Sequence, residues 1–174
     1  EPSVFIPILE DTGLMVRAGQ WVFAAGCRQR VAWSSILPAN CTIALNVSAR
    51  QFADKFLVQT IRRILEQTEL PVEQVELELT ESMLLRDVEA SVGKMRELRT
   101  LGVRLALDDF GTGYSSLSLL QHLPLDQLKI DQSFVHRIGS GESDGDAAII
   151  QSIITLGKSL HMRVIAEGIE TRSQ

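Results

Sequence analysis

Five short apolar segments of the chain each end in polar or charged residues. They are TIALNVS (42–48), VELELTE (75–81), VRLALDD (103–109), DQLKID (126–131) and RVIAEGIE (163–170). Stretches with apolar residues at helical spacing lie between them, over 53–67, 87–100 and 146–160. Strands that alternate with helices are typical of βα units. The pattern therefore predicts an α/β protein with a parallel sheet.

The apolar faces of the helical stretches are expected to be core. The face of 53–67 includes Leu57 and Ile61, that of 87–100 includes Val88, and that of 146–160 includes Ile149. Trp21 and Trp33 are likewise expected to pack within the first helical region.

The predicted strands have one apolar face and one polar face. In 75–81, large aliphatic residues alternate with Glu76, Glu78 and Thr80. An open sheet covered by helices on both sides would need two apolar faces, so we favour a TIM-like (β/α)8 barrel with a polar lumen. Such a barrel typically needs about 250 residues. With five clear strands in 174 residues, we expect one partial barrel domain, 1–174, that lacks its first strand and last units and belongs to a larger multidomain protein.

Composition restricts the partners. The 22 acidic and 17 basic residues give a net charge of −5, which argues against binding polymeric nucleic acid but allows a small anionic ligand beside bound cations. No apolar run approaches the roughly 20 residues that span a bilayer, so we expect no direct membrane contact from this segment. Two cysteines without metal-binding spacing indicate reduced thiols in a cytoplasmic domain.

The polar residues at the strand ends form a candidate site. They are Asn46, Glu78, Asp108, Asp109, Lys129 and Glu167. Parallel barrels build their active sites from residues at the carboxyl ends of their strands. Carboxylates with one carboxamide are also ligands that a hard divalent cation prefers. The strand ends therefore predict a metal-dependent enzyme.

A glycine-rich segment, GTGYSSL (111–117), follows the paired aspartates. Gly111 and Gly113 permit the conformations that a closing active-site loop uses. The alternative is a tight turn into a helix capped by Ser115 or Ser116.

Taken together, the motifs resemble the EAL domain family of bacterial cyclic di-GMP phosphodiesterases. The matching motifs are FIPILEDTGL (5–14), NVSARQF (46–52), DDFGTGYSSL (108–117), KIDQSFV (129–135) and AEGIET (166–171). The resemblance covers essentially the whole chain, and its two longest motifs, DDFGTGYSSL and KIDQSFV, are highly specific together.

The resemblance implies a role for each site residue. The implied ligands of two Mg²⁺ or Mn²⁺ ions are Asn46, Glu78, Asp108, Asp109 and Glu167. Lys129 is similar to the lysine that holds the attacking water or the phosphate. Glu81 is similar to the glutamate that anchors the loop after the paired aspartates. Glu170 resembles a supporting glutamate near the lysine.

The implied reaction is hydrolysis of cyclic di-GMP to linear pGpG by water activated between two metal ions. The family's E-x-L motif, whose glutamate is a metal ligand, has no match in this chain, and neither has its C-terminal glutamine motif. A non-catalytic cyclic di-GMP receptor therefore remains an alternative, as does a different metal-dependent barrel hydrolase. The resemblance also implies a homodimer, fused regulatory or GGDEF-type domains, and a cytoplasmic location within a parent protein that a membrane anchor could hold.

Overall fold

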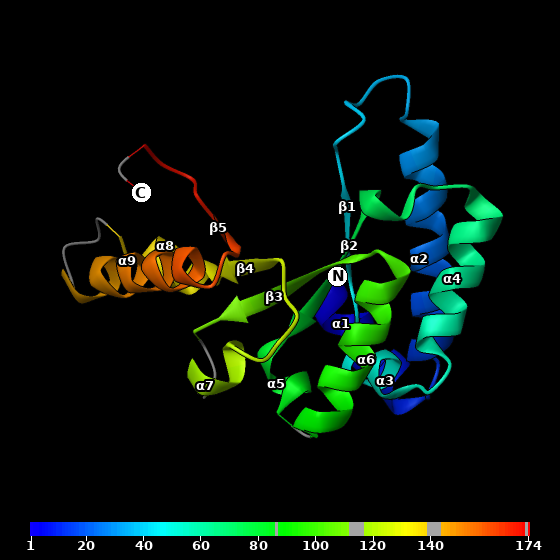
Figure 1. Ribbon diagram of the computed structural model, residues 1–174, viewed down its shortest axis with the longest axis horizontal. Helices are drawn as coiled ribbons and strands as arrows, with labels where there is room; N and C mark the ends of the chain where they lie inside the picture. Colours follow the sequence, from blue (N-terminus) through cyan, green and yellow to red (C-terminus); the bar gives the residue numbers. More distant parts are fainter. Residues whose placement is uncertain (86, 112–116, 139–143, 173) are drawn as a thin grey trace. The chain divides into compact units, whose positions relative to one another are not determined.

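The computed structural model describes residues 1–85, 87–111, 117–138, 144–172 and 174 (Figure 1). Its elements in chain order are α1 (Pro2–Asp11), α2 (Met15–Ala32), β1 (Ile43–Asn46), α3 (Ala49–Ala53), α4 (Leu57–Thr68), a 3₁₀ turn (Val72–Gln74), β2 (Val75–Thr80), α5 (Glu81–Leu84), α6 (Val88–Leu101), β3 (Arg104–Phe110), α7 (Leu117–Leu120), β4 (Gln127–Ile130), α8 (Gln132–His136), α9 (Asp144–Ser159) and β5 (Arg163–Ala166). The predicted alternation of strands and helices is confirmed. The chain forms two compact units, Glu1–Glu78 with Arg96–Arg104, and Leu79–Met95 with Leu105–Gln174.

In the first unit, β1 and β2 pair in parallel, so that Asn46 lies opposite Glu78 at their carboxyl ends. Helix α2 contacts β1 and α4. A methyl group at Gly26 of α2 would lie 2.9 Å from Cδ2 of Leu45, so the helix packs closely against the side chains of β1 at this glycine. The ends of β1 and β2 are thereby fixed side by side.

In the second unit, β3, β4 and β5 pair in parallel in this order. Leu128 and Ile130 of β4 are fully buried, and α9 lies against β4 and β5. The backbone N–H of Glu167 donates to the carbonyl oxygen of Ile130 over 3.1 Å, which extends the β4–β5 ladder one residue past β5. Because parallel strands point the same way, their carboxyl ends lie at one edge of this sheet.

The predicted core faces are confirmed in part. Leu57, Ile61, Ile64 and Leu65 of α4 are all buried. Val88 and Ile149 are 37% and 43% exposed, and were wrongly expected to be core. Val88 is the first residue of α6, and Ile149 lies about 100° around α9 from the buried Ile150.

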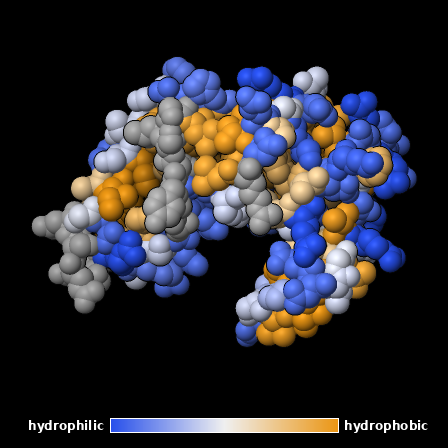
Figure 2. Space-filling view, turned by 90° about the horizontal axis from the view of Figure 1, so that it is seen from below, coloured by the Kyte–Doolittle hydropathy of each residue, from blue (hydrophilic) through white to orange (hydrophobic). Residues whose placement is uncertain are grey.

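The prediction that Trp21 and Trp33 are packed is wrong, because they are 68% and 43% exposed. The buried face of α2 is formed by Phe23, Cys27 and Arg30. Trp21 is two positions from Phe23 and so about 200° around the helix, while Trp33 follows the last helical residue. Apolar residues are visible on the surface in Figure 2.

Candidate metal centre

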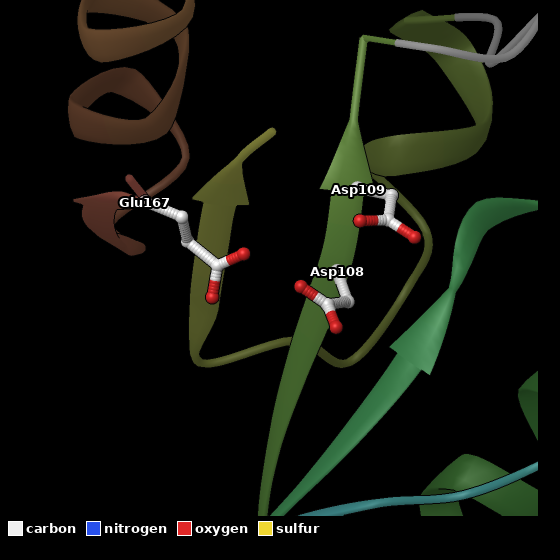
Figure 3. Close-up of side chains that lie close together, drawn as sticks. All are labelled: Asp108, Asp109 and Glu167. Atoms are coloured by element: carbon white, nitrogen blue, oxygen red, sulfur yellow. The ribbon is translucent and has the colours of Figure 1, made fainter. Parts of the chain in front are cut away.

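Three carboxylates converge at the carboxyl edge of the second unit. Asp108 and Asp109 are near the end of β3, and Glu167 follows β5 directly. Each offers an oxygen atom, and these atoms all lie within 4.8 Å of one another. Figure 3 shows the side chains of Asp108 and Glu167 extending toward each other, with Asp109 above them. The three carboxylates form a site of the size and chemistry that a divalent cation prefers.

An irregularity in β3 explains how neighbouring aspartates can belong to one site. Consecutive side chains of a regular strand point to opposite faces. The pairing of β3 with β4 shifts register between Leu107 and Phe110, and Asp109 has a left-handed backbone with φ of 53°. Such a conformation is costly for most residues, but aspartate tolerates it better than most. The bend brings the carboxylates of Asp108 and Asp109 onto the same side.

Lys129 of β4 supplies the positive charge of the cluster. Its Nζ lies 3.0 Å from Oδ1 of Asp108 and 2.6 Å from Oε1 of Glu167. Lys129 is only 8% exposed. A buried ammonium group needs such partners, because an unpaired buried charge is expensive. One lysine among three carboxylates leaves the cluster with an excess of negative charge.

The excess negative charge acts on Asp109. Burial raises the pKa of its carboxyl group, and the neighbouring Asp108, Asp131 and Glu167 raise it further, while Lys129 opposes them. A raised pKa means that the ionised form is disfavoured in this environment. A cation bound at the cluster would relieve the same repulsion.

Asp131 is a member of the cluster that sequence reasoning missed. It caps the amino end of α8, where its Oδ1 accepts the N–H of Ser133 over 2.9 Å. Hydrogen bonds from Ser133 hold the pKa of Asp131 below its usual range, and a further hydrogen bond joins Asp131 to Asp109. Asp109, with the higher pKa, is the donor when it is protonated. The signal was available: Asp131 lies two residues after Lys129, just past the end of β4.

The other two predicted metal ligands lie in the first unit. Asn46 ends β1 and is exposed, whereas Glu78 of β2 is buried. The two residues are register partners, and the N–H of Val47 donates to the carbonyl oxygen of Glu78 over 3.0 Å. The pairing places a carboxamide and a carboxylate at adjacent strand ends, as the sequence predicted.

Glu81 and Glu170, the predicted supporting residues, have different environments. Glu81 is 4% exposed, and neither of its carboxylate oxygens has a hydrogen-bond partner in the described part of the chain. Glu170 is exposed, and its backbone N–H donates to Oε1 of Gln174. The glycine-rich segment that Glu81 was expected to anchor lies largely outside the described residues, which omit 112–116. Both roles stay predictions.

Curated proteins similar in sequence cover nearly the whole chain. The bifunctional diguanylate cyclase/cyclic di-GMP phosphodiesterase MucR of Pseudomonas aeruginosa is 43% identical over 173 residues, which are 99% of this chain and 25% of MucR. The chain thus spans about a quarter of this relative's length. The signaling protein YkoW of Bacillus subtilis is 39% identical over 173 residues, or 99% of this chain and 21% of YkoW.

Solved structures show the same fold. The structure described as the PaMucR phosphodiesterase in complex with c-di-GMP has a TM-score of 0.94 and 42% identity, covering 99% of this chain and 69% of that one. The EAL domain of Mycobacterium smegmatis DcpA has a TM-score of 0.81 and 38% identity, covering 89% and 69%. The predicted α/β class and partial TIM-like barrel are confirmed. Among the described helices, none is both long and apolar enough to cross a membrane.

The family match extends over the whole chain. The family model described as "EAL domain" matches residues 1–174. The predicted resemblance is therefore confirmed, and the chain belongs to the EAL domain family.

Proposed function

We propose that this chain carries the catalytic residues of a phosphodiesterase that hydrolyses cyclic di-GMP to linear pGpG. The observation that supports this most is the cluster of Asp108, Asp109 and Glu167 around Lys129, in a chain 42% identical to a phosphodiesterase solved with c-di-GMP. Phosphodiester hydrolysis needs stabilisation of the negative charge on the phosphate in the transition state, and a buried lysine beside carboxylates that could hold divalent cations suits that chemistry.

The donor set fits Mg²⁺ or Mn²⁺. The three clustered carboxylates provide only oxygen ligands, and they carry more negative charge than Lys129 balances. We propose that two such ions are held by the predicted ligands Asn46, Glu78, Asp108, Asp109 and Glu167. When bound, the ions would supply Lewis-acid polarisation of the phosphodiester and lower the pKa of water.

The protein's own groups have distinct tasks in this proposal. Lys129, fixed between Asp108 and Glu167, presents its ammonium group to the attacking water or to the phosphate. Asp131 caps α8 and is hydrogen bonded to Asp109, and thereby restrains the Asp109 side chain. Glu81 anchors the segment after the aspartates, and Glu170 supports the lysine.

The proposal also concerns the parent protein. The chain is 25% of MucR, whose name includes a diguanylate cyclase activity. We propose that residues 1–174 form part of one cytoplasmic phosphodiesterase domain, joined to regulatory or GGDEF-type domains in a parent protein, with or without a membrane anchor, that forms a homodimer. The size of the parent in solution, measured by light scattering, tests the last point.

The test is incubation of the intact parent domain with cyclic di-GMP and Mn²⁺, followed by chromatography. Formation of pGpG, absent from an EDTA sample and from an Asp108→Ala variant, is the expected result. A folded parent that yields no product contradicts the enzyme. Calorimetric binding of intact cyclic di-GMP would then support the receptor instead. Faster cleavage of other phosphodiesters would support a different hydrolase.

A further inference from the structure

The segment after Glu167 is held against α8 at both of its ends. At the near end, Gly168 has a left-handed backbone with φ of +71°. A methyl group there would lie 2.7 Å from Cβ of Gln132 and 3.0 Å from Nε2 of His136. Both neighbours belong to α8. The chain can thus leave Glu167 and pass this closely over α8 only with glycine at position 168.

At the far end, the side chain of Gln174 makes three hydrogen bonds. Its Oε1 accepts the N–H groups of Glu170 and Thr171, both over 2.8 Å. Its Nε2 donates to the carbonyl oxygen of Val135 in α8 over 3.3 Å. One amide group therefore closes the turn on itself and ties it to α8, which is 39 positions away along the sequence.

Helix α8 also borders the other parts of the acidic cluster. It begins directly after Asp131, which is hydrogen bonded to Asp109 and lies two residues after Lys129. A methyl group at Gly111, two residues after Asp109, would lie 2.9 Å from Cε2 of Phe134. The chain segments that carry Asp109, Lys129 and Glu167 therefore all contact or adjoin one short helix.

We infer that Gln174 is a positioning residue for the proposed phosphodiesterase reaction. By accepting the N–H groups of Glu170 and Thr171 and donating to Val135, it fixes the described chain after Glu167 on α8, and so holds Glu167 in the orientation that meets Lys129 and holds the backbone of Glu170 in place. The inference rests on the proposed function. The β4–β5 ladder holds Glu167 through its backbone N–H group, which donates to the carbonyl oxygen of Ile130. The side chain of Glu167 is 35% exposed, so packing alone restrains it weakly.

Substitutions can distinguish the role of the side-chain oxygen of Gln174, which accepts hydrogen bonds, from that of its side-chain nitrogen, which donates one. Gln174→Glu keeps an oxygen acceptor for the N–H groups of Glu170 and Thr171 but loses the donor to Val135. Gln174→Met keeps the length of the side chain and loses all three hydrogen bonds. Gln67→Met is the matched control, because Gln67 is an exposed glutamine of α4 in the other unit.

The first readout is hydrogen exchange of the Glu170 and Thr171 amides, measured by NMR without metal or substrate. We expect about fivefold faster exchange of these amides in Gln174→Met, since each loses its hydrogen-bond acceptor, and near-native exchange in Gln174→Glu, which keeps an acceptor. Unchanged exchange in Gln174→Met overturns the inference whatever the chain catalyses.

The second readout is steady-state hydrolysis of cyclic di-GMP with saturating Mn²⁺. We expect Gln174→Met and Gln174→Glu both to lower kcat about tenfold with KM within twofold, because both lose the donor to Val135 that ties the segment to α8, and we expect Gln67→Met to match the native protein. Faster amide exchange with native kcat shows a merely structural tie and overturns the inference. Absence of hydrolysis in the native protein contradicts the proposed function instead, and with it the catalytic role of Gln174. The exchange of the Glu170 and Thr171 amides would still show whether Gln174 holds this segment in place.

Discussion

Replacing Lys129 with methionine tests how the cluster balances its charge. The substitution keeps the apolar length of the side chain and removes the ammonium group that lies 3.0 Å from Asp108 and 2.6 Å from Glu167. Removing one partner of a buried ion pair costs about 3 to 5 kcal/mol, because the other charge is left uncompensated. Glu167 is 35% exposed and partly screened by solvent, so we take the lower end, about 3 kcal/mol.

The assay is urea unfolding of metal-free protein at pH 7 and pH 5, with Lys158→Met as the control. Lys158 is an exposed lysine of α9, and its replacement is expected to change the free energy of unfolding by less than about 0.5 kcal/mol. At pH 5 the destabilisation by Lys129→Met should be smaller, because the raised pKa of Asp109 favours its protonation as the pH falls, which lessens the repulsion that Lys129 had offset.

Divalent metal distinguishes charge balance from simple packing. With Lys129 absent, the cluster attracts a cation more strongly, so Mn²⁺ should restore the stability of Lys129→Met and bind it more tightly than it binds the native protein. Hydrolysis should nevertheless fall by about 100-fold or more, the usual cost of losing one charged group that stabilises a transition state. Native stability at pH 7 in metal-free Lys129→Met would refute the reasoning, and so would weaker Mn²⁺ binding.

Three further predictions concern single positions. Because the pKa of Asp109 is raised in the folded protein, its contribution to the free energy of unfolding is present below the ordinary aspartate pKa and is lost as the pH rises through the raised value. In metal-free protein, Asp109→Asn should abolish this loss of stability with rising pH. Urea unfolding at several pH values would detect the difference. Burial raises the pKa of Cys27 from 9.0 to about 11, so about 2 kcal/mol of stability should be lost as the pH rises across this interval in the native protein but not in Cys27→Ala. Equal slopes of the free energy of unfolding against pH in the two proteins would contradict the assignment. Gly93→Ala should raise the free energy of unfolding by about 0.5 to 1 kcal/mol, because among the described residues nothing beyond the backbone of α6 itself lies within 4 Å of the added methyl group. Gly102→Ala should lower the free energy of unfolding, because residue 102 has φ of +107° and its methyl group would lie 2.8 Å from Cγ1 of Val72. Thermal unfolding would check both signs.

The strands and the candidate site residues could be predicted because both depend on local pattern. Alternation within 75–81 identified β2, and polar residues at strand ends identified Asp108, Lys129 and Glu167. The structure brings these three together in the second unit, since parallel strands share one carboxyl edge.

The remaining features depend on contacts that no local pattern encodes. The left-handed backbone of Asp109 lies within the register shift between β3 and β4, and this shift depends on how two strands separated by α7 pair with each other. The exposure of Trp21 was missed because apolar character alone does not decide which face of α2 meets β1. The tie from Gln174 to Val135 spans 39 positions and involves a backbone carbonyl, which leaves no trace in the sequence.

The central claim is that the cluster of Asp108, Asp109 and Glu167 binds the divalent metal that cyclic di-GMP hydrolysis requires. The most direct measurement is the rate of pGpG formation by the parent domain as a function of Mn²⁺ concentration, for the native protein and for Asp108→Asn. We expect a saturable dependence on Mn²⁺ in the native protein and a rate at least about 100-fold lower in the folded variant. Hydrolysis by Asp108→Asn at the native rate, or a native rate independent of Mn²⁺, would contradict it.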